Sequence, residues 1–421
     1  MKKNILVFPC GSEIGLDIHR QMKYSTHFHL IGGNSVADHG QYVYDDYIGN
    51  IPFLSDKSFI PAMQSIIKER KIDAIYPATD ATITLLKQHE TDLGCKIIAP
   101  PLEITKICLS KEETYKRLSG LVTIPRVYGK DDILPYPVFV KPKIGYGSRG
   151  ARLIYNAQEL ATEDDLSSKL ILEYLPGDEY TVDCFTDRHG RLLFSAARIR
   201  NRIRTGISVN TSFVTNQEEF KAIAEKINEA IGFRGAWFFQ VKRNKEGNLS
   251  LLEIAARFGG SSLLCAAIGV NFPLLTLFDA FEYDVHVQPN SYNVEIDRAF
   301  SCKYKHNIKY SCVYVDFDDC LYINKECLNT ELMGFLFHCI NKGIKIILLT
   351  KHEGNLEEKL NKFRISHLFD KVLHIPAYET KYKFMTEQDA IFIDDSYAER
   401  TQVANHLHIP VFSPEMVEIL I

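Results

Sequence analysis

The sequence predicts a multidomain protein of the α/β and α+β classes. With 421 residues, the chain is too long for one ordinary hydrophobic core. Over residues 3–101 apolar strands alternate with helical stretches, which is typical of a parallel, doubly wound sheet. A polar, irregular stretch spans residues 283–310 and is followed by a new apolar strand. Three domains are therefore expected, at residues 1–108, 109–305 and 306–421.

The composition is that of a globular protein. Apolar residues make up 46% and charged residues 24% of the chain, and no uninterrupted apolar run is long enough to span a bilayer. A formal net charge of -4 gives no electrostatic reason to expect a nucleic acid partner. The ten cysteines form no C-x-x-C pair, so reduced thiols in a cytoplasm are the simplest account. Neither a membrane nor a nucleic acid is expected as a partner, and the formation of a homo-oligomer is left open.

Two turns in the first domain invite a ligand-binding interpretation. Strands are expected at residues 5–8, 29–31, 74–76 and 97–99, and helices at residues 14–22, 59–68 and 83–89. The turn from Gly11 to Gly15 lacks the third glycine of a dinucleotide-binding fingerprint, and a tight strand-to-helix turn needs glycine for packing in any case. Thr79 and Asp80 follow another strand, where open sheets bind ligands, but such residues more often cap the next helix.

A lysine and a glycine-rich loop predict a phosphate-binding site in the second domain. Residues 138–140 predict a strand that holds Lys141 rigidly. The loop glycines Gly145, Gly147 and Gly150 allow backbone N–H groups to approach an anion closely. The loop matches neither the Walker nor the dinucleotide pattern, so an ordinary turn is the alternative. Upstream, a helix that carries Lys111 is expected from about residue 109 to residue 126.

Charged residues recur along the strands that follow. Glu173 and Glu179 bracket a break at Pro176 and Gly177 between two predicted strands over residues 170–184. Four arginines of equal parity come next and share one face if their strand stays regular, namely Arg198, Arg200, Arg202 and Arg204. An anion-binding face and a solvated edge strand are equally compatible with this pattern.

A predicted hairpin brings two oxygen ligands together. Residues 237–242 and 249–254 predict strands joined by a turn, and the hairpin would present Gln240 and Glu253 inward. Such a pair can hold a hard cation such as Mg2+, or it can form a cross-strand hydrogen bond. Both interpretations are open at this point.

These parts, in this order, resemble the ATP-grasp superfamily, which includes carbamoyl-phosphate synthetase large subunits, biotin carboxylase and D-alanine ligases. The resemblance covers roughly residues 1–300 and rests on Lys111, Lys141 with its glycine loop, E-Y-L-P-G-D-E-Y-T-V-D, the arginine-bearing strand and Gln…Glu-x-x-x-Arg. It implies a Rossmann-like domain ahead of an ATP-grasp fold, with ATP and Mg2+ as cofactors. It further implies that a small-molecule carboxylate is converted to an acyl-phosphate, from which an amine or similar nucleophile displaces phosphate.

The resemblance also implies a role for each matched residue. The ATP-binding residues would be Lys111, Lys141, Gly145 and Gly147 around the phosphates, Glu173 to Leu175 at the adenine and ribose end, and Glu179 facing the ribose. Gln240 and Glu253 would hold magnesium, and Arg257 would meet the transferred phosphate or the substrate carboxylate.

One position departs from the family pattern. The family reads Glu-x-Asn-x-Arg, whereas Ala255 stands at the place of the asparagine. One ligand of a second Mg2+ is therefore missing, so weakened or altered catalysis is an alternative. The other functions to be distinguished are a regulatory or scaffold module that binds ATP without ligation, and a kinase that acts on a hydroxyl.

In the third domain, polar residues follow three predicted strands. These strands lie at residues 312–315, 345–350 and 390–393. The polar residues are Asp316, Asp318 and Asp319 after the first strand, Thr350 at the end of the second, and Asp394 and Asp395 after the third. Clustered carboxylates are costly to ionise together unless a cation binds among them, so a metal site is expected here.

This set resembles the haloacid dehalogenase-like (HAD) phosphohydrolases over about residues 310–421. The resemblance implies a Rossmann-like domain that hydrolyses a phosphomonoester, with Asp316 as nucleophile, Asp318 as general acid and base, and Thr350 as phosphate ligand. Lys381, in preference to Lys383, would neutralise the phosphoryl group. Magnesium would be held by Asp316, the backbone of Asp318, Asp394 and Asp395.

Two further features of this domain bear on its function. Too few residues separate Leu321 from Lys345 for a large cap domain, so at most a minimal cap is expected. Cys320 takes the place of the usual threonine, which has a supporting role, and loss of activity is not expected from this change. Together with the first two domains, this predicts a bifunctional enzyme.

Overall fold

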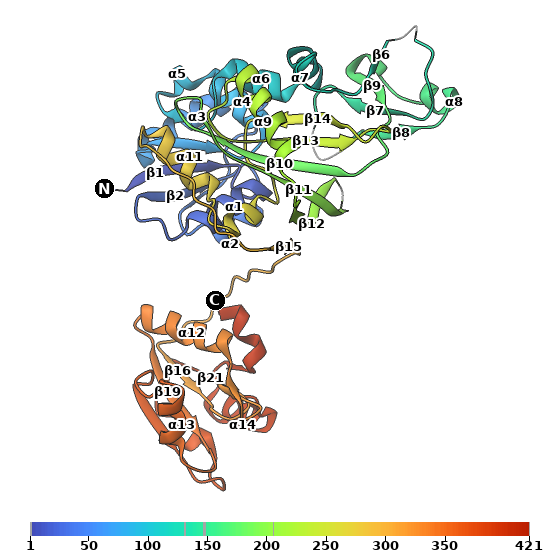
Figure 1. Ribbon diagram of the computed structural model, residues 1–421. Coiled ribbons are helices and arrows are strands. Elements are labelled where there is room, and N and C mark those ends of the chain that lie inside the picture. Colours follow the sequence, from blue (N-terminus) through green and yellow to red (C-terminus); the bar gives the residue numbers. More distant parts are fainter. Residues whose placement is uncertain (1, 130–131, 146–148, 205, 421) are drawn as a thin grey trace. The chain divides into compact units, whose positions relative to one another are not determined.

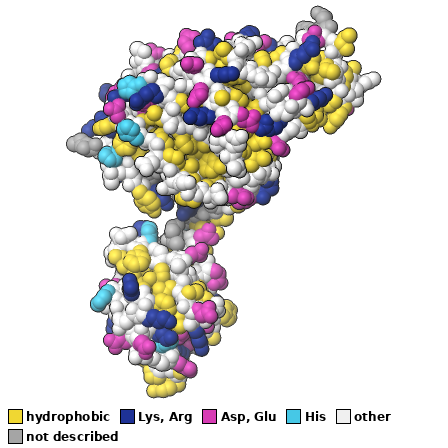
Figure 2. Space-filling model, in the orientation of Figure 1, with side chains coloured by type: hydrophobic (Ala, Val, Ile, Leu, Met, Phe, Trp, Pro, Cys, Tyr) yellow, Lys and Arg dark blue, Asp and Glu magenta, His cyan; other side chains and the backbone are white. Residues whose placement is uncertain are grey.

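The computed structural model describes residues 2–129, 132–145, 149–204 and 206–420. The chain divides into two compact units, a first unit of Met1–Ser301 and a second unit of Cys302–Ile421 (Figure 1). Figure 2 shows basic and acidic side chains interspersed over the visible face of each unit. None of the described helices is long and apolar enough to cross a membrane.

A five-stranded parallel sheet forms the first layer of the first unit. Its strand order is β3-β2-β1-β4-β5. The strands are β1 (Lys3–Phe8), β2 (Phe28–Gly33), β3 (Tyr47–Ile48), β4 (Ala74–Pro77) and β5 (Lys96–Ile97). The helices of this region are α1 (Glu13–Met22), α2 (Gly40–Val43), α3 (Phe59–Arg70), α4 (Asp80–Gln88), α5 (Glu90–Leu93), α6 (Leu102–Leu109) and α7 (Lys111–Leu118). The alternation of strands and helices that the sequence predicts is therefore observed.

Helices cover both faces of this parallel sheet. Val7 of β1 packs in a core cluster with Ile18 of α1, whereas the preceding residue, Leu6, packs in another cluster with Met63 of α3. Successive side chains of a strand point to opposite faces, so the two clusters lie on opposite sides of the sheet. Burying each of these apolar side chains contributes about 1.5–3 kcal/mol.

The two turns singled out in this layer are explained by local structure. Ser12 caps α1 and Thr79 caps α4, each accepting a hydrogen bond from a backbone N–H three residues on. Gly15 is required for packing, because a Cβ atom there would lie 2.5 Å from the carbonyl oxygen of Cys10. The commoner interpretation of Thr79, as a helix cap, is therefore confirmed. Asp80 has a separate partner that is described below.

Two antiparallel sheets complete the first unit. The smaller sheet has the order β6-β9-β7-β8, and the larger has the order β14-β13-β10-β11-β12-β15. The smaller contains β6 (Val127–Tyr128), β7 (Val138–Pro142), β8 (Arg152–Ile154) and β9 (Lys169–Glu173). The larger contains β10 (Glu179–Thr186), β11 (Leu192–Arg204), β12 (Ile207–Phe213), β13 (Gly235–Arg243), β14 (Leu249–Ala255) and β15 (Glu295–Asp297). The helical segments are α8 (Ala157–Ala161), η1 (Leu166–Ser168), α9 (Glu218–Ile231), α10 (Leu263–Ala267) and α11 (Phe272–Ala280).

Strand β10 of the larger sheet is buried on both faces. Val182 of β10 packs in a core cluster with Ile227 of α9. Phe185 of the same strand packs in the cluster that contains Val7 and Ile18 of the first layer. The six-stranded sheet and the parallel sheet therefore share one hydrophobic core, which fixes the ends of β1 and β4 relative to β14 and β15.

Two predicted elements differ from the structure. The helix expected up to residue 126 ends at Leu118, and Gly120 follows with a left-handed φ of 77° that stops a helix. The arginine-bearing strand β11 does not stay regular, because its register against β12 shifts at Asn201 and again after Arg202. The condition for a single four-arginine face is therefore not met.

The second unit is built around its own parallel sheet. Its strand order is β20-β19-β16-β21-β22. The strands are β16 (Cys312–Val315), β19 (Lys345–Thr350), β20 (Lys371–His374), β21 (Ala390–Ile393) and β22 (Val411–Phe412). The helical segments are α12 (Thr330–Asn341), α13 (Leu356–Lys362), η2 (Lys381–Phe384), α14 (Tyr397–Leu407) and η3 (Pro414–Leu420). Between β16 and α12 lies only a small hairpin of β17 (Tyr322–Ile323) and β18 (Cys327–Leu328) among the described residues.

Candidate active sites

Six of the residues predicted to bind ATP or magnesium line one cavity in the first unit. The cavity has a volume of about 130 Å3 and lies between the small antiparallel sheet and the larger one. The six residues are Lys111, Lys141, Gly145, Glu179, Gln240 and Glu253. Arg149 and Arg200 also line it. Cations and carboxylates converging on one cavity are suited to a polyphosphate with a metal ion.

Lys141 is buried and lines this cavity. Its ammonium donates hydrogen bonds to the hydroxyl of Tyr115 at 2.9 Å and to the carbonyl of Leu252 at 2.8 Å. Burial lowers the pKa of Lys141 to about 8, and although Glu253 acts to raise it, neighbouring Lys111 acts to lower it further. Among the described residues no carboxylate forms an ion pair with this desolvated ammonium, which favours an incoming anion.

Lys111 connects the glycine loop to the predicted metal ligand. It is the first residue of α7, and its ammonium donates to the carbonyl of Gly145 at 2.9 Å. The same ammonium lies 3.5 Å from a carboxylate oxygen of Glu253. Its backbone N–H also donates to the carbonyl of Lys143. The start of α7 is therefore tied to the glycine loop at two points.

The hairpin places its two predicted metal ligands opposite each other. Gln240 of β13 pairs in register with Glu253 of β14. Glu179 of β10 also lines the cavity, and it accepts a hydrogen bond from Arg200. The predicted register of the hairpin is confirmed, and the assignment of Gln240 and Glu253 to a metal stays a prediction. A carboxylate and an amide oxygen on neighbouring strands fit a hard cation that also binds phosphate.

Three predicted residues do not line this cavity, and one cannot be placed. Glu173 accepts a hydrogen bond from the backbone N–H of Arg126 at 3.2 Å, and Leu175 is buried. Arg257 forms two parallel hydrogen bonds with Asp80, of 2.9 and 2.8 Å. Gly147 lies outside the described residues.

Two residues that contact predicted site residues in this region were not predicted from the sequence as their partners. Tyr115, which orients Lys141, follows Lys111 by four residues on α7, and this helical spacing was the available signal. Asp80 was interpreted as part of a capping turn, and its pairing with Arg257 joins positions 177 residues apart.

Three arginines of β11 are paired with carboxylates. Arg198 is buried and donates to Asp183 at 2.6 Å, and Arg200 pairs with Glu179. Arg202 lies 2.7 Å from Asp297 and is exposed. Each of these three arginines contacts a different carboxylate, and the pairs differ in their exposure to solvent. The strand is therefore neither a uniform anion-binding face nor a uniformly solvated edge.

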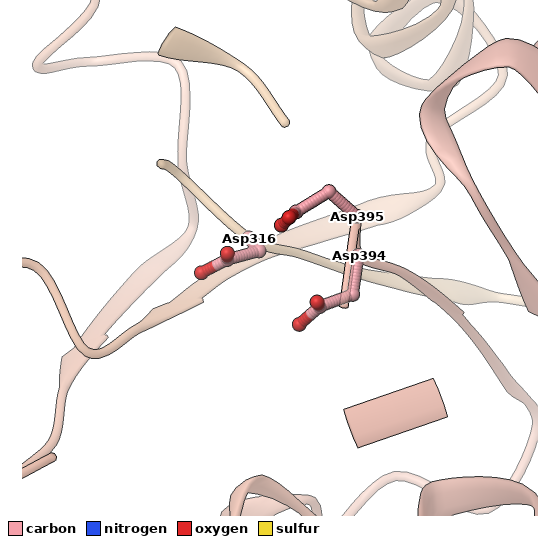
Figure 3. A group of neighbouring side chains, drawn as sticks. All are labelled: Asp316, Asp394 and Asp395. Atoms are coloured by element: carbon pink, nitrogen blue, oxygen red, sulfur yellow. The ribbon is translucent and has the colours of Figure 1, made fainter. Parts of the chain in front are cut away.

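Three carboxylates gather in the second unit. Asp316 follows β16, and Asp394 and Asp395 follow β21, the strand hydrogen-bonded to β16. One oxygen from each lies within 4.8 Å of the others, and Figure 3 shows the three side chains projecting to the same side. Oxygen-only ligands in this arrangement fit a hard cation such as Mg2+. Burial, and then the charge of Asp316, raises the pKa of Asp394 to about 7.

Lys381 completes this carboxylate cluster. Its ammonium is buried and lies 2.8 Å from Asp316 and 2.5 Å from Asp394. Burial acts to lower the pKa of Lys381, but the two carboxylates outweigh burial and the pKa is raised. Lys383 is exposed and pairs with Glu379 at 3.5 Å. The geometry therefore brings Lys381, rather than Lys383, to Asp316.

Thr350 and Asp318 lie at the neighbouring strand ends. Thr350 ends β19, is fully buried, and accepts a hydrogen bond from the backbone N–H of His352 at 3.2 Å. The Nδ1 atom of His352 lies 2.9 Å from both carboxylate oxygens of Asp318. The sequence reasoning missed His352, although it stands only two residues after Thr350.

Comparisons with known proteins place the first unit among ATP-grasp folds. Residues 165–304 match the family model described as "ATP-grasp in the biosynthetic pathway with Ter operon". A biotin carboxylase from Campylobacter jejuni in a β-γ-ATP complex is 20% identical, with a TM-score of 0.57 over 68% of this chain and 73% of that chain. No curated protein matches the chain.

Two further solved structures show the same similarity. The biotin carboxylase domain of a 2-oxoglutarate carboxylase from Hydrogenobacter thermophilus, solved with MgADP, ADP and bicarbonate, is 19% identical, with a TM-score of 0.56 over 69% of this chain and 71% of that chain. An L-amino acid ligase from Bacillus licheniformis is 16% identical, with a TM-score of 0.55 over 66% of this chain and 74% of that chain.

The first unit therefore has the ATP-grasp fold, as the sequence predicted. The family match covers residues 165–304, and the similarity to the solved structures is one of fold.

Proposed function

We propose that this chain is a bifunctional enzyme, in which the first unit is an ATP-dependent carboxylate-amine ligase and the second unit is a magnesium-dependent phosphomonoesterase of the HAD type. For the ligase, the observation that carries the proposal is the convergence of Lys111, Lys141 and Glu253 on one cavity of an ATP-grasp fold. The solved relatives that contain ADP or MgADP support ATP and Mg2+ as the cofactors.

In the ligase, Lys141 and Lys111 would bind the phosphates of ATP. Gln240 and Glu253 would hold Mg2+, which withdraws charge from the phosphates when it is bound. A carboxylate oxygen of the acid attacks the γ-phosphorus, the bond to the bridging oxygen breaks, and ADP leaves. The nitrogen of an amine then attacks the acyl carbon, phosphate leaves, and the nitrogen loses a proton.

Trapping with hydroxylamine tests the ligase and separates it from its alternatives. The full chain is incubated with ATP, Mg2+, a panel of carboxylic acids and hydroxylamine, and hydroxamate and ADP are measured. A ligase gives both products in equal amounts with at least one acid, because hydroxylamine captures the acyl-phosphate. A kinase acting on a hydroxyl gives ADP and a stable phosphorylated product without hydroxamate.

The regulatory alternative rests on Ala255, which ends β14 two residues after Glu253. A methyl group cannot ligate a cation, so a second Mg2+ would have fewer protein ligands here. Calorimetry that shows ATP binding, together with no ADP and no hydroxamate for any acid, would favour a module that binds ATP without ligation.

In the second unit, Asp316 would attack the phosphorus of a phosphomonoester. A carboxylate oxygen forms the new bond, the alcohol leaves with a proton from Asp318, and water then hydrolyses the aspartyl-phosphate. Lys381, 2.8 Å from Asp316, would neutralise the phosphoryl group, and Thr350 would bind one of its oxygens. A Mg2+ ion held by Asp316, Asp394 and Asp395 would reduce the repulsion between the two anions.

Hydrolysis of p-nitrophenyl phosphate tests this second activity. The small hairpin β17–β18 leaves only a minimal cap next to Asp318, so a synthetic aryl phosphate is a suitable probe. Turnover should require Mg2+ and should be lost on chelation. Turnover that is unaffected by chelation would contradict the proposed metal site.

A further inference from the structure

Tyr115 lies between the proposed phosphate-binding lysine and the strand that carries a proposed metal ligand. It belongs to α7, is 3% exposed, and follows Lys111 by four residues, on the same face of the helix. Its ring packs with Leu170 and Leu172 of β9 in one small core cluster. The proposed ATP site therefore contains a buried tyrosine that has no role in the proposed reaction as described so far.

The hydroxyl of Tyr115 is part of a closed triangle of hydrogen bonds. It accepts a bond from the ammonium of Lys141 at 2.9 Å and donates one to the carbonyl of Leu252 at 3.0 Å. The same carbonyl accepts a second bond from Lys141 at 2.8 Å. Three elements meet in this triangle, because Tyr115 comes from α7, Lys141 from β7 of the smaller sheet and Leu252 from β14 of the larger sheet.

The partners of the Lys141 ammonium in this triangle are uncharged. Burial, and then the charge of Glu253, raises the pKa of Tyr115, so the phenol stays neutral and keeps its proton for Leu252. The ring of Tyr115 also lies against the ammonium, with its centroid 5.3 Å from Nζ of Lys141. Lys141 is therefore held in place by a hydroxyl, a carbonyl and an aromatic ring.

Glu253 is the carboxylate that would compete for this ammonium. It directly follows Leu252 on β14 and lines the same cavity as Lys141. Its charge acts to raise the pKa of Lys141. Among the described residues, however, the ion-pair partner of Glu253 is Lys111, at 3.5 Å, and not Lys141. The buried ammonium and the proposed metal ligand are thus near each other and unpaired.

A direct ion pair between Lys141 and Glu253 would disable both groups. The attraction between opposite charges grows where solvent is excluded, so a desolvated ammonium tends to move towards a carboxylate within its reach. The pair would withdraw the ammonium from the phosphates and the carboxylate from a cation. Hydrogen bonds to Tyr115 and Leu252 oppose this movement, because they satisfy the ammonium where it is. Of these two acceptors, only the hydroxyl belongs to a side chain.

We infer that Tyr115 is a positioning residue, whose hydroxyl holds the ammonium of Lys141 apart from Glu253. The lysine thereby stays available to the phosphates of a nucleotide, and the carboxylate stays available to a cation. Tyr115 acts through Lys141 rather than on the nucleotide itself. The inference rests on the proposed nucleotide-binding function of the first unit.

Binding of ADP to Tyr115→Phe tests this role. Phenylalanine keeps the buried ring and removes only the hydroxyl, so the ammonium is released towards Glu253. The affinity of the full chain for ADP, measured by calorimetry in EDTA without Mg2+, should fall by about tenfold. Tyr44→Phe is the matched control and should leave the affinity unchanged. Tyr44 is also 3% exposed, and it donates to the carbonyl of Gly15 at 2.6 Å.

Proton uptake on ADP binding separates positioning from the simple loss of a hydrogen bond. Burial, and then the charges of Glu253, Lys111 and Glu179, act on the pKa of Lys141. If Lys141 pairs with Glu253 in Tyr115→Phe, its pKa rises and the ammonium is already charged before ADP binds, so uptake at pH 8.5 should fall towards zero. If the ammonium stays in place and only loses an acceptor, its pKa falls and uptake increases. Increased uptake would contradict the inference.

A second substitution shows whether Glu253 is the competing partner. In Glu253→Gln the carboxylate is absent, so the further change Tyr115→Phe should weaken ADP binding by no more than about twofold. Mg2+ is omitted so that the loss of a proposed metal ligand does not enter the comparison. Tenfold weakening in both backgrounds would contradict the inference, because additive effects indicate that the two side chains act independently.

The outcomes for this inference and for the proposed function can be told apart. If ADP binds to wild type and to Tyr115→Phe with equal affinity and equal proton uptake, the role of Tyr115 is overturned and the proposed ATP site is left intact. If ADP does not bind to wild type, the proposed ATP site is overturned, and the inference with it. The inference predicts weaker binding with reduced uptake in Tyr115→Phe, and little effect of the same substitution in the Glu253→Gln background.

Discussion

Lys141 and Lys381 are both buried ammonium groups, yet their pKa values move in opposite directions. Burial lowers the pKa of Lys141 to about 8, whereas Asp316 and Asp394 outweigh burial at Lys381 and raise its pKa. The difference is that Lys381 already has two carboxylates within 2.8 Å, and Lys141 contacts a hydroxyl and a carbonyl. Lys141 is therefore the group whose charge state should respond most strongly to an anionic ligand.

Nucleotide binding at alkaline pH should be coupled to proton uptake by Lys141. At pH 8.5 a group with a pKa of about 8 is charged in about a quarter of the molecules, so binding of a polyphosphate should take up roughly 0.7 proton. Calorimetry with ADP in buffers of different ionisation enthalpy measures this number. Lys141→Met should abolish the uptake, whereas Lys116→Met, at an exposed lysine of the same helix, should retain it.

The same shift sets the pH dependence of stability. The folded pKa of Lys141 lies below its ordinary value of 10.5, so the unfolded chain binds more protons between these values. The free energy of unfolding without ligand should therefore gain a contribution from Lys141 as pH rises from about 8 to about 10.5. Urea unfolding that shows the same pH profile for wild type and Lys141→Met would contradict this assignment.

We expect His352 to position Asp318 for the proposed phosphatase activity. Its Nδ1 atom meets both carboxylate oxygens at 2.9 Å, and its ring packs edge-on against Phe317. His352→Asn places an N–H donor near the Nδ1 position, whereas His352→Gln places it near Nε2. The glutamine variant should lower kcat for p-nitrophenyl phosphate by about 10–100-fold, with KM nearly unchanged, and the asparagine variant should recover most of the loss. Equal activity in both variants would show that the Nδ1 contact has no positioning role.

At the scale of elements, regular patterns were predictable and irregular ones were not. The hairpin of β13 and β14 follows from alternating apolar residues and a turn, and its register brings Gln240 opposite Glu253 as expected. The pairing of the arginines in β11 could not be predicted, because register shifts around Arg202 depend on the partner strand β12. Periodicity reports the face of a regular strand and carries no information on bulges.

In the candidate sites, too, some residues could be predicted from the sequence and others could not. The residues at strand ends in the second unit, such as Asp316 and Asp394, could be named because parallel strands end at one edge of a sheet. The pairs Arg257–Asp80 and Arg298–Glu13 could not, because they join residues 177 and 285 positions apart. Only the packing of two sheets on a shared core brings these partners together.

A substitution in helix α12 tests the stability of one element apart from either proposed site. Gly334 lies in its interior, is exposed, and would accept a Cβ atom with nothing within 4 Å among the described residues. Gly334→Ala should therefore stabilise the second unit by about 0.5–1 kcal/mol. The single tryptophan, Trp237, lies in β13 of the first unit and reports the unfolding of that unit.

Denaturant unfolding followed by two probes measures this effect. Far-UV circular dichroism should show a transition that moves to higher denaturant in Gly334→Ala, while the transition of Trp237 fluorescence stays in place. A shift of the fluorescence transition by the same amount would show that the two units unfold as one.

At the scale of the whole molecule, the two proposed phosphate sites differ in their electrostatics. The first unit presents lysines to a cavity, as suits a polyphosphate ligand, and the second unit presents carboxylates around Lys381, as suits a bound cation. Among the residues that the structure describes, none that lines the cavity of the first unit belongs to the carboxylate cluster of the second unit. The two activities should therefore be separable by single substitutions.

The most direct test of the account measures both activities in two variants of the full chain. Asp316→Asn should lower the hydrolysis of p-nitrophenyl phosphate by about 10³-fold or more, because it removes the nucleophile, and it should leave ATP-dependent hydroxamate formation within about twofold. Lys141→Met should have the opposite pattern. Loss of both activities in either variant, or of neither in both, would contradict the central claim that one chain contains two separate phosphate chemistries.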